Sequence, residues 1–137
     1  MTPEELAALH VRCFETPRPW TAAEFRNLLT MTGVFLNATD AGFALGRVIV
    51  DEAELLTLAV DPPARRHGLG RALLADFETS AASRGATSAL LEVSAANAPA
   101  IALYTAAGFL RTGHRPGYYR TPHGARIDAL LLAKALS

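Results

Sequence analysis

Hydrophobic residues recur along this chain with two different periods, and the order of these periods predicts the order of its elements. Over residues 3–14 and 22–29 apolar side chains return every three to four positions, which is typical of amphipathic helices. Each segment follows a threonine placed three residues before a glutamate: Thr2 with Glu5, and Thr21 with Glu24. Because this spacing lets each pair satisfy exposed backbone amides, we predict two helices that begin after these threonines.

Segments with strand character follow the two helices. Residues 33–38 and 42–51 are apolar runs on either side of the turn-forming sequence TDAG. Residues 54–60, ELLTLAV, are apolar on both faces, as in strands that are covered on both sides. We therefore predict a hairpin and then a buried strand.

A third helix and a second buried strand come next. Apolar residues spaced four apart predict a helix over residues 69–83: Leu69, Leu73, Phe77 and Ala81. Gly85 ends this helix, and residues 87–93, TSALLEV, predict the strand. A single helix between two buried strands implies a right-handed crossover and a parallel strand pair.

A short helix and the last strands complete the pattern. Asn97 caps the helix and Gly108 ends it. The strands are predicted within residues 109–114, FLRTGH, and 125–136, ARIDALLLAKAL. Together with the length, this pattern predicts one α/β domain over residues 1–137.

Charge and composition exclude several classes of protein. The chain has 13 basic and 13 acidic residues and a formal net charge of zero, which argues against a dedicated nucleic-acid or membrane-surface binder. Its one cysteine, Cys13, excludes a disulfide framework, so we expect a buried thiol in a cytoplasmic protein. No secretory signal and no apolar run of about 18 residues is apparent, so no membrane span is expected. The four histidines lack ligand spacing, so no metal site is expected either.

The sequence RRHGLGR, residues 65–71, joins positive charge to two glycines where the third predicted helix begins. The first amides of a helix lack intrahelical acceptors, and the helix dipole makes that end partly positive. Gly68 and Gly70 would let an anion approach the backbone closely. Two interpretations remain open, a seat for a phosphate or pyrophosphate and a glycine-containing loop with a solvated basic rim. The stretch is neither a Walker A loop nor a complete dinucleotide fingerprint.

Three segments of the chain together resemble a known family. Arg65-x-x-Gly68-x-Gly70 after LAVDP is similar to the Q/R-x-x-G-x-G/A signature of the GCN5-related N-acetyltransferase (GNAT) superfamily. The segment LLEVSAANAPAIALYTAAGF, ending at Phe109, is more specific and resembles the bacterial ribosomal-protein-alanine N-acetyltransferase, or RimI-like, branch. The C-terminal YYRTPHGARIDALLLAKAL and the earlier PWTAAEF resemble the same branch.

This resemblance implies a GNAT-type fold with two departures. The implied fold is a mixed, largely antiparallel sheet with a central parallel strand pair and helices on both faces. The family opens with a strand, whereas this chain opens with a predicted helix, so we expect the first edge strand to be missing. A free sheet edge would suit a monomer or a weak dimer. Arg120 stands where the family usually has proline, so the substrate-side loop is expected to differ.

The resemblance also implies acetyl-coenzyme A (acetyl-CoA) as cosubstrate and assigns its contacts. The loop that would hold the pyrophosphate comprises Arg65, Arg66, His67, Gly68, Leu69, Gly70 and Arg71. The backbone of Leu58, Ala59 and Val60 would bind the pantetheine arm like an added strand, and one amide would stabilise the oxyanion. Asn97 would contact the same arm in addition to capping its helix.

Two residues are candidates for proton transfer. Alternation places Glu92 on the face of Leu90, where burial would raise the pKa of its carboxyl and suit a general base. A plain alternative is an edge glutamate paired with an arginine. The family resemblance favours the base, and it implies that Tyr104 protonates the leaving thiolate, although a tyrosine at this position can also be simply a core residue.

The acceptor is expected to be a primary amine, and elementary acid–base chemistry favours an α-amine. Deprotonating lysine near pH 7.4 costs roughly 4 kcal/mol, against well under 1 kcal/mol for a peptide N-terminus. The RimI-like resemblance implies the N-terminal alanine of a ribosomal protein. A small-molecule amine as acceptor, and a non-catalytic acyl-CoA-binding regulatory domain, remain as alternatives. The second of these would not need Glu92 and Tyr104 together.

Overall fold

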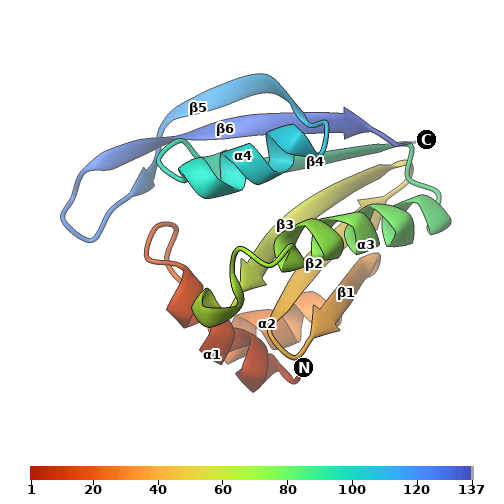
Figure 1. Ribbon diagram of the computed structural model, residues 1–137, viewed down its shortest axis with the longest axis horizontal. Helices are drawn as coiled ribbons and strands as arrows, with labels where there is room; N and C mark the ends of the chain where they lie inside the picture. Colours follow the sequence, from red (N-terminus) through yellow and green to blue (C-terminus); the bar gives the residue numbers. More distant parts are fainter. Residues whose placement is uncertain (137) are drawn as a thin grey trace.

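The computed structural model describes residues 1–136, whose helices and strands follow one another in the predicted order (Figure 1). The helices are α1 Pro3–Cys13, α2 Ala22–Leu29, α3 Leu69–Ser83 and α4 Ala98–Ala106, with a short 3-10 helix η1 at Pro62–Ala64. The strands are β1 Val34–Thr39, β2 Gly42–Ile49, β3 Glu52–Val60, β4 Ser88–Ser94, β5 Leu110–Arg120 and β6 Arg126–Ala135. Of the predicted domain 1–137, only Ser137 lies outside the described residues.

Both N-terminal helices begin with the predicted capping boxes. The Thr2 hydroxyl accepts a hydrogen bond from the Glu5 amide at 3.1 Å, and the Glu5 carboxylate accepts one from the Thr2 amide at 2.9 Å. Thr21 and Glu24 repeat the arrangement at 3.2 and 3.0 Å. Four amides that would otherwise lack acceptors are therefore satisfied by sequence-local side chains.

The six strands form one sheet in the order β1-β2-β3-β4-β6-β5. Neighbouring strands are antiparallel except for β3 and β4, which are parallel and joined by α3. This confirms the predicted fold class, a largely antiparallel sheet with a central parallel pair. In the described chain the first strand, β1, follows two helices and lies at an edge of the sheet.

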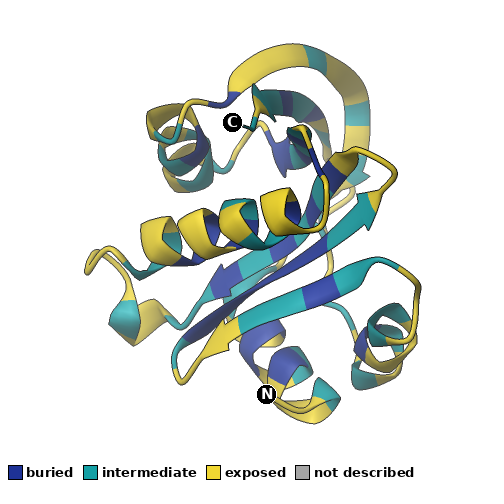
Figure 2. Cartoon of the chain, turned by 90° about the vertical axis from the view of Figure 1, so that its right-hand side faces the viewer, coloured by how far each residue is buried: buried dark blue, intermediate teal, exposed yellow. Residues whose placement is uncertain are grey.

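Helices cover both faces of the sheet and create two hydrophobic clusters. Alternation along β2 sends Phe43 toward α1 and α2, where Leu6 and Phe25 pack, and sends Ala44 toward α3 and α4. On that second face Phe77 of α3 is fully buried, as its helical spacing predicts. Figure 2 shows the buried residues lining the inner sides of the helices and the strands between them.

A β-bulge in β3 decides which side chains face which cluster. Leu45 pairs with Thr57 and Gly46 pairs with Leu55, so Leu56 is an extra residue on β3. The bulge leaves Leu56 in the cluster with α1 and α2, whereas Leu58 packs against the cluster on the α3 and α4 side.

Two local expectations differ from the structure. The strand predicted within residues 109–114 is β5, which extends to Arg120, because its mostly exposed residues carry no hydrophobic alternation to mark its length. Cys13 is only partly buried, at the last turn of α1, and its thiol donates to the carbonyl oxygen of Val60 at 3.3 Å. Over residues 1–136, none of the helices combines the length and the apolar character that crossing a membrane requires.

Candidate active site

The two parallel strands of the sheet separate partway along their length. β3 and β4 pair only at Glu52–Glu54 with Ser88–Leu90, although both strands continue in the same direction. β3 keeps its pairing with β2 as far as Val60, so one edge of its second half faces the opening. Backbone polar groups along such an edge can bind an extended ligand as an added strand would.

Leu58, Ala59 and Val60 lie on the part of β3 that borders this opening. Leu58 and Val60 pack against the cluster beneath α3 and α4, and Ala59 is buried in the other cluster. Their side chains therefore hold this part of β3 in the sheet, and the contact of its backbone with a ligand stays a prediction.

The start of α3 presents free amides beside the end of β3. Gly68 is the N-cap residue with a φ of 79°, and it offers no capping side chain. The first helical hydrogen bond runs from the Ala72 amide to the Gly68 carbonyl at 3.0 Å, which leaves the amides of Leu69, Gly70 and Arg71 pointing out of the helix end. A β-carbon at Gly68 would meet nothing within 4 Å, so an anion has open access here.

The basic side chains of this loop have different positions. The Arg65 Nε donates to the carbonyl oxygen of Val60 at 3.1 Å, so this guanidinium ties the loop to the end of β3. Arg66, which has a φ of 68°, is exposed together with His67 and Arg71. The geometry therefore suits the anion seat better than a plain solvated rim, because the free amides and the exposed arginines Arg66 and Arg71 lie at one end of one helix.

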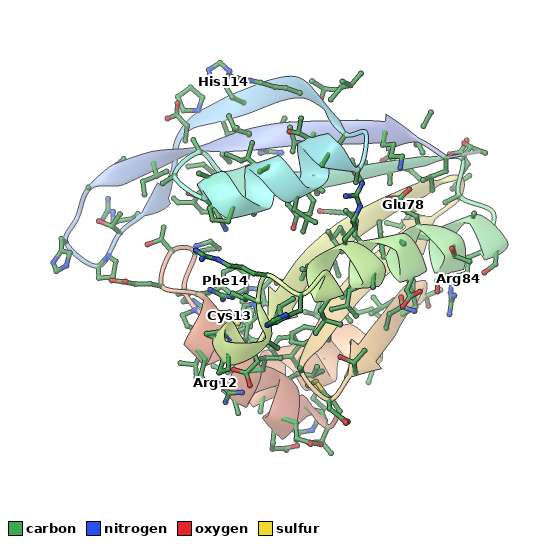
Figure 3. The ribbon with its side chains drawn as sticks, viewed as in Figure 1. Arg12, Cys13, Phe14, Glu78, Arg84 and His114 are labelled. Carbon is green, nitrogen blue, oxygen red and sulfur yellow. The ribbon has the colours of Figure 1, made fainter. Side chains whose placement is uncertain are left out.

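A groove runs from Arg71 along α3 and has a volume of about 530 Å³. Its floor includes Lys134 of β6, whose Nζ donates to the Glu78 carboxylate at 2.7 Å and to the carbonyl oxygen of Ala107 at 2.6 Å. These contacts connect α3, the end of α4 and the last strand. Figure 3 shows Glu78 on the side of α3 that faces β6 and the end of α4.

The side chains of Glu92 and Tyr104 lie on opposite faces of the sheet. Leu91 and Val93 are buried beneath α3 and α4, so Glu92 lies on the opposite side from them, as alternation predicted, and this is the α1 and α2 face. Tyr104 of α4 is only 7% exposed, its ring lies edge-on to Phe109, and burial raises the pKa of its phenol to about 12. The phenol therefore stays protonated at neutral pH and has a proton to donate, although the raised pKa makes it a weaker acid than an ordinary tyrosine.

The surroundings of Glu92 correct one sequence expectation. Its side chain is 25% exposed rather than fully buried, and a guanidinium nitrogen of Arg115 lies 3.1 Å from its carboxylate. The alternative of an arginine-paired glutamate is thus right about the partner. β4 lies between β3 and β6 in the sheet order, but at Glu92 it pairs with β6 alone, because β3 and β4 have already separated. The pairing orients the Glu92 carboxylate, which stays partly open to solvent.

Sequence reasoning missed two neighbours of Glu92. The pKa of the Glu54 carboxyl is raised, mainly by burial and also by the charge of Glu92. Burial, together with the Glu92 charge, also raises the pKa of the Tyr119 phenol to about 12. Glu54 interrupts an apolar strand and could have been noticed for that. Tyr119 was noted only as part of the tyrosine pair that resembles the family branch, and its place beside Glu92, like that of Arg115, is set by strand register.

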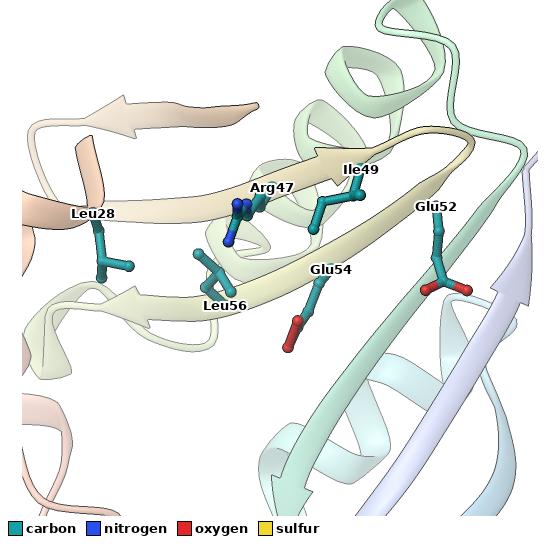
Figure 4. Close-up of a pocket in the computed structure, with 6 residues that line it drawn as sticks. All are labelled: Leu28, Arg47, Ile49, Glu52, Glu54 and Leu56. Carbon is teal, nitrogen blue, oxygen red and sulfur yellow. The ribbon is translucent and has the colours of Figure 1, made fainter. Parts of the chain in front are cut away.

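A small pocket of about 120 Å³ lies next to these residues, on the α2 side of the sheet. Its lining combines apolar and charged side chains: Leu28, Arg47, Ile49, Glu52, Glu54 and Leu56 (Figure 4). The other predicted ligand residue, Asn97, follows β4 and caps α4, since its side-chain oxygen accepts from the Ala100 amide at 3.2 Å. Within residues 1–136, histidine, cysteine and acidic side chains form no group of three or more that could hold a metal ion.

A sheet that opens between two parallel strands, beside a helix whose free amides follow a glycine turn, defines the class of acyl-CoA-using GNAT folds. Residues 4–109 match the Acetyltransferase (GNAT) family, and the chain belongs to it.

Relatives within the family carry more specific names. The [ribosomal protein bS18]-alanine N-acetyltransferase of Escherichia coli K12 is 39% identical over 140 residues, which cover 96% of this chain and 90% of the relative. The N-alpha-acetyltransferase RimI of Mycobacterium tuberculosis is 36% identical and covers 85% of this chain and 78% of its own length. The crystal structure of the ribosomal-protein-S18-alanine N-acetyltransferase from Escherichia coli superposes with a TM-score of 0.84 at 36% identity, over 96% of this chain and 85% of that one. The likeness to the RimI-like branch predicted from the sequence is thereby confirmed.

Proposed function

We propose that this protein transfers the acetyl group of acetyl-CoA to the N-terminal α-amine of a protein, and specifically to the N-terminal alanine of a ribosomal protein. One observation supports the proposal: Glu92 lies where β4 has separated from β3, on one face of the sheet, and the buried phenol of Tyr104 lies on the other face. The names of the relatives supply the acceptor.

The binding roles follow from the free backbone groups. The amides of Leu69, Gly70 and Arg71 would donate hydrogen bonds to the pyrophosphate of acetyl-CoA. The exposed Arg66 would add positive charge around it, and His67 would offer a further hydrogen-bond donor. The edge of β3 over Leu58–Val60 would hold the pantetheine arm, and an amide there would stabilise the oxyanion.

The chemistry is a direct transfer between two substrates. Glu92, held by Arg115, would take a proton from the acceptor ammonium, so that the neutral amine forms a nitrogen–carbon bond with the thioester carbonyl. When the carbon–sulfur bond breaks, the coenzyme thiolate would receive the phenolic proton of Tyr104, and the new amide nitrogen would lose its second proton to solvent. The two residues then return to their starting states by exchanging protons with water.

Thiol release from acetyl-CoA tests this proposal with two peptides side by side. One peptide has a free N-terminal alanine and no lysine, and the other has a blocked N-terminus and one lysine. Release with the first peptide alone is expected, because its amine is far less costly to deprotonate. Release with the second alone would establish lysine selectivity, and release with neither would favour small amines or a non-catalytic coenzyme-binding domain.

The Glu92→Gln variant tests the role of the base within the same assay. It should lower turnover at neutral pH while acetyl-CoA affinity stays nearly unchanged, because the carboxylate lies on the acceptor face. An unaltered dependence of rate on pH would remove Glu92 from the mechanism.

A further inference from the structure

One buried histidine connects the loop between α1 and α2 to β3. His10, on the inner face of α1, is 1% exposed. Its Nδ1 accepts a hydrogen bond from the backbone amide of Trp20 at 3.0 Å, and its Nε2 lies 3.0 Å from the hydroxyl oxygen of Thr57. Because the amide can only donate, Nδ1 carries no proton, and the neutral ring has its proton on Nε2, which donates to Thr57.

Aromatic packing fixes this ring and keeps it neutral. Phe14 stacks on it at a centroid distance of 4.3 Å and Trp20 at 5.1 Å, while Phe25 of α2 meets it edge-on. Burial lowers the pKa of His10 to about 4, and the charged group that acts on it is Glu24, which raises the pKa slightly in opposition. The imidazole therefore makes both hydrogen bonds at neutral pH.

The two partners of His10 belong to the two halves of the proposed site. Trp20 lies near the end of the loop between α1 and α2, residues 14–21. This loop rises toward the β5–β6 hairpin (Figure 1), and we take it as the acceptor side of the proposed site. Thr57 follows the bulged Leu56 on β3 and directly precedes Leu58, where the backbone faces the opening. A second contact from the end of α1, the Cys13 thiol to the Val60 carbonyl, strengthens the same connection.

We propose that His10 is a positioning residue, which holds the α1–α2 loop as the acceptor wall in a fixed place relative to the coenzyme-binding half of β3. This inference rests on the proposed function for the roles of the two segments. The imidazole touches neither substrate, so it acts through the Trp20 amide on one side and the Thr57 hydroxyl on the other.

Two substitutions separate the two hydrogen bonds. His10→Asn places an amide oxygen near Nδ1 and keeps an acceptor for Trp20, but it loses the bond to Thr57. His10→Gln reaches toward Thr57 with its terminal amide and leaves the Trp20 amide without its acceptor. Thr57→Val removes the second bond alone, and Leu9→Ala removes a buried side chain of the same helix without touching either bond.

Steady-state kinetics with acetyl-CoA and the alanine peptide should distinguish these variants by which constant changes, KM or kcat. His10→Gln is expected to raise the KM for the peptide about tenfold with the KM for acetyl-CoA unchanged, as one buried hydrogen bond is lost. His10→Asn and Thr57→Val should keep the peptide KM and lower kcat, and Leu9→Ala should lower stability only. Equal effects of His10→Gln and His10→Asn, or the same peptide effect in Leu9→Ala, would overturn the proposal.

Nuclear magnetic resonance tests the inference without any activity. The imidazole nitrogen shifts of the whole wild-type protein should show the Nε2-protonated tautomer, and the Trp20 amide proton should exchange slowly in wild type and His10→Asn but rapidly in His10→Gln. The opposite tautomer, or equal exchange in all three proteins, would refute the positioning role. Should the wild type fail to acetylate the alanine peptide, the proposed acceptor would be wrong, and this measurement would still decide whether His10 holds the loop.

Discussion

Gly68 and Gly70 lie two residues apart at the start of α3, yet only Gly68 has a backbone conformation that requires glycine. Gly68 has a φ of 79°, a left-handed conformation that costs a residue with a β-carbon about 1–2 kcal/mol. Its β-carbon position is empty within 4 Å, so no steric clash adds to this cost. Gly70 is helical, and a β-carbon there would lie 3.4 Å from a Leu103 methyl and 3.7 Å from a Val60 methyl, which are ordinary contacts.

Alanine at these two positions should therefore shift stability in opposite directions. Gly68→Ala should lower the free energy of unfolding by about 1 kcal/mol, which is roughly 4 °C in Tm for a chain of this size. Gly70→Ala should raise it by up to about 1 kcal/mol, because alanine has the higher helix propensity. Gly68→Ala should also weaken acetyl-CoA binding much more than acceptor binding, because the turn at this residue directs the first amides of α3.

Thermal unfolding without ligand and calorimetric titration with acetyl-CoA measure both quantities. Gly70→Ala serves as the matched control, since it adds the same methyl group two residues further along. If both variants moved Tm in the same direction, the conformational argument would fail. If Gly68→Ala bound acetyl-CoA as tightly as the wild type, the loop would not be the pyrophosphate seat.

Three further predictions concern titrating groups. Tyr104→Phe should slow turnover with little loss of stability, because only a hydroxyl is removed from a packed ring; full activity would make Tyr104 a packing residue. The low pKa of His10, about 4 against an ordinary value near 6.5, means that the unfolded chain binds a proton first, so acidification from pH 6.5 to below 4 should cost about 3 kcal/mol. Urea unfolding should show that the stability advantage of wild type over His10→Gln shrinks across this range, and a constant difference would contradict the linkage. The pKa of Glu54 is raised, so its charged form destabilises the fold at pH values above the ordinary carboxyl range. Glu54→Gln should therefore raise Tm at pH 7, and this increase in Tm should disappear in acid. An unchanged Tm at pH 7 would count against the burial of Glu54.

Local sequence signals predicted those parts of the molecule that depend on neighbouring residues. The threonine–glutamate spacing at Thr2 and Thr21 located two helix starts, and the apolar spacing over residues 69–83 gave the bounds of α3. Asn97 was likewise recognised as a cap, because its hydrogen bond spans only three residues. These features follow from helix geometry, which repeats over a few positions.

Contacts between distant residues escaped sequence reasoning. Arg115 reaches Glu92 only through the pairing of β4, β6 and β5, and a change of one residue in register would point it to the other face. The hydrogen bond between His10 and Thr57 depends on the bulge at Leu56, which brings Thr57 to the face of α1. A bulge of this kind leaves no trace in the hydrophobic pattern. The sequence therefore predicted a strand there, but not that its side chains exchange faces of the sheet after Leu56.

The separation of β3 and β4 has a consequence for the lifetime of the protein. Without a ligand, the second half of β3 is held by β2 on one side only, so it is the inner segment of the sheet most exposed to local opening and hydrogen exchange. A ligand that lies along this edge acts as the missing strand, and at a hundred times its Kd it would stabilise the folded state by about 2.7 kcal/mol. The amount of folded enzyme in a cell would then rise and fall with the supply of acetyl-CoA, so scarcity of the acetyl donor would limit both the reaction and the catalyst.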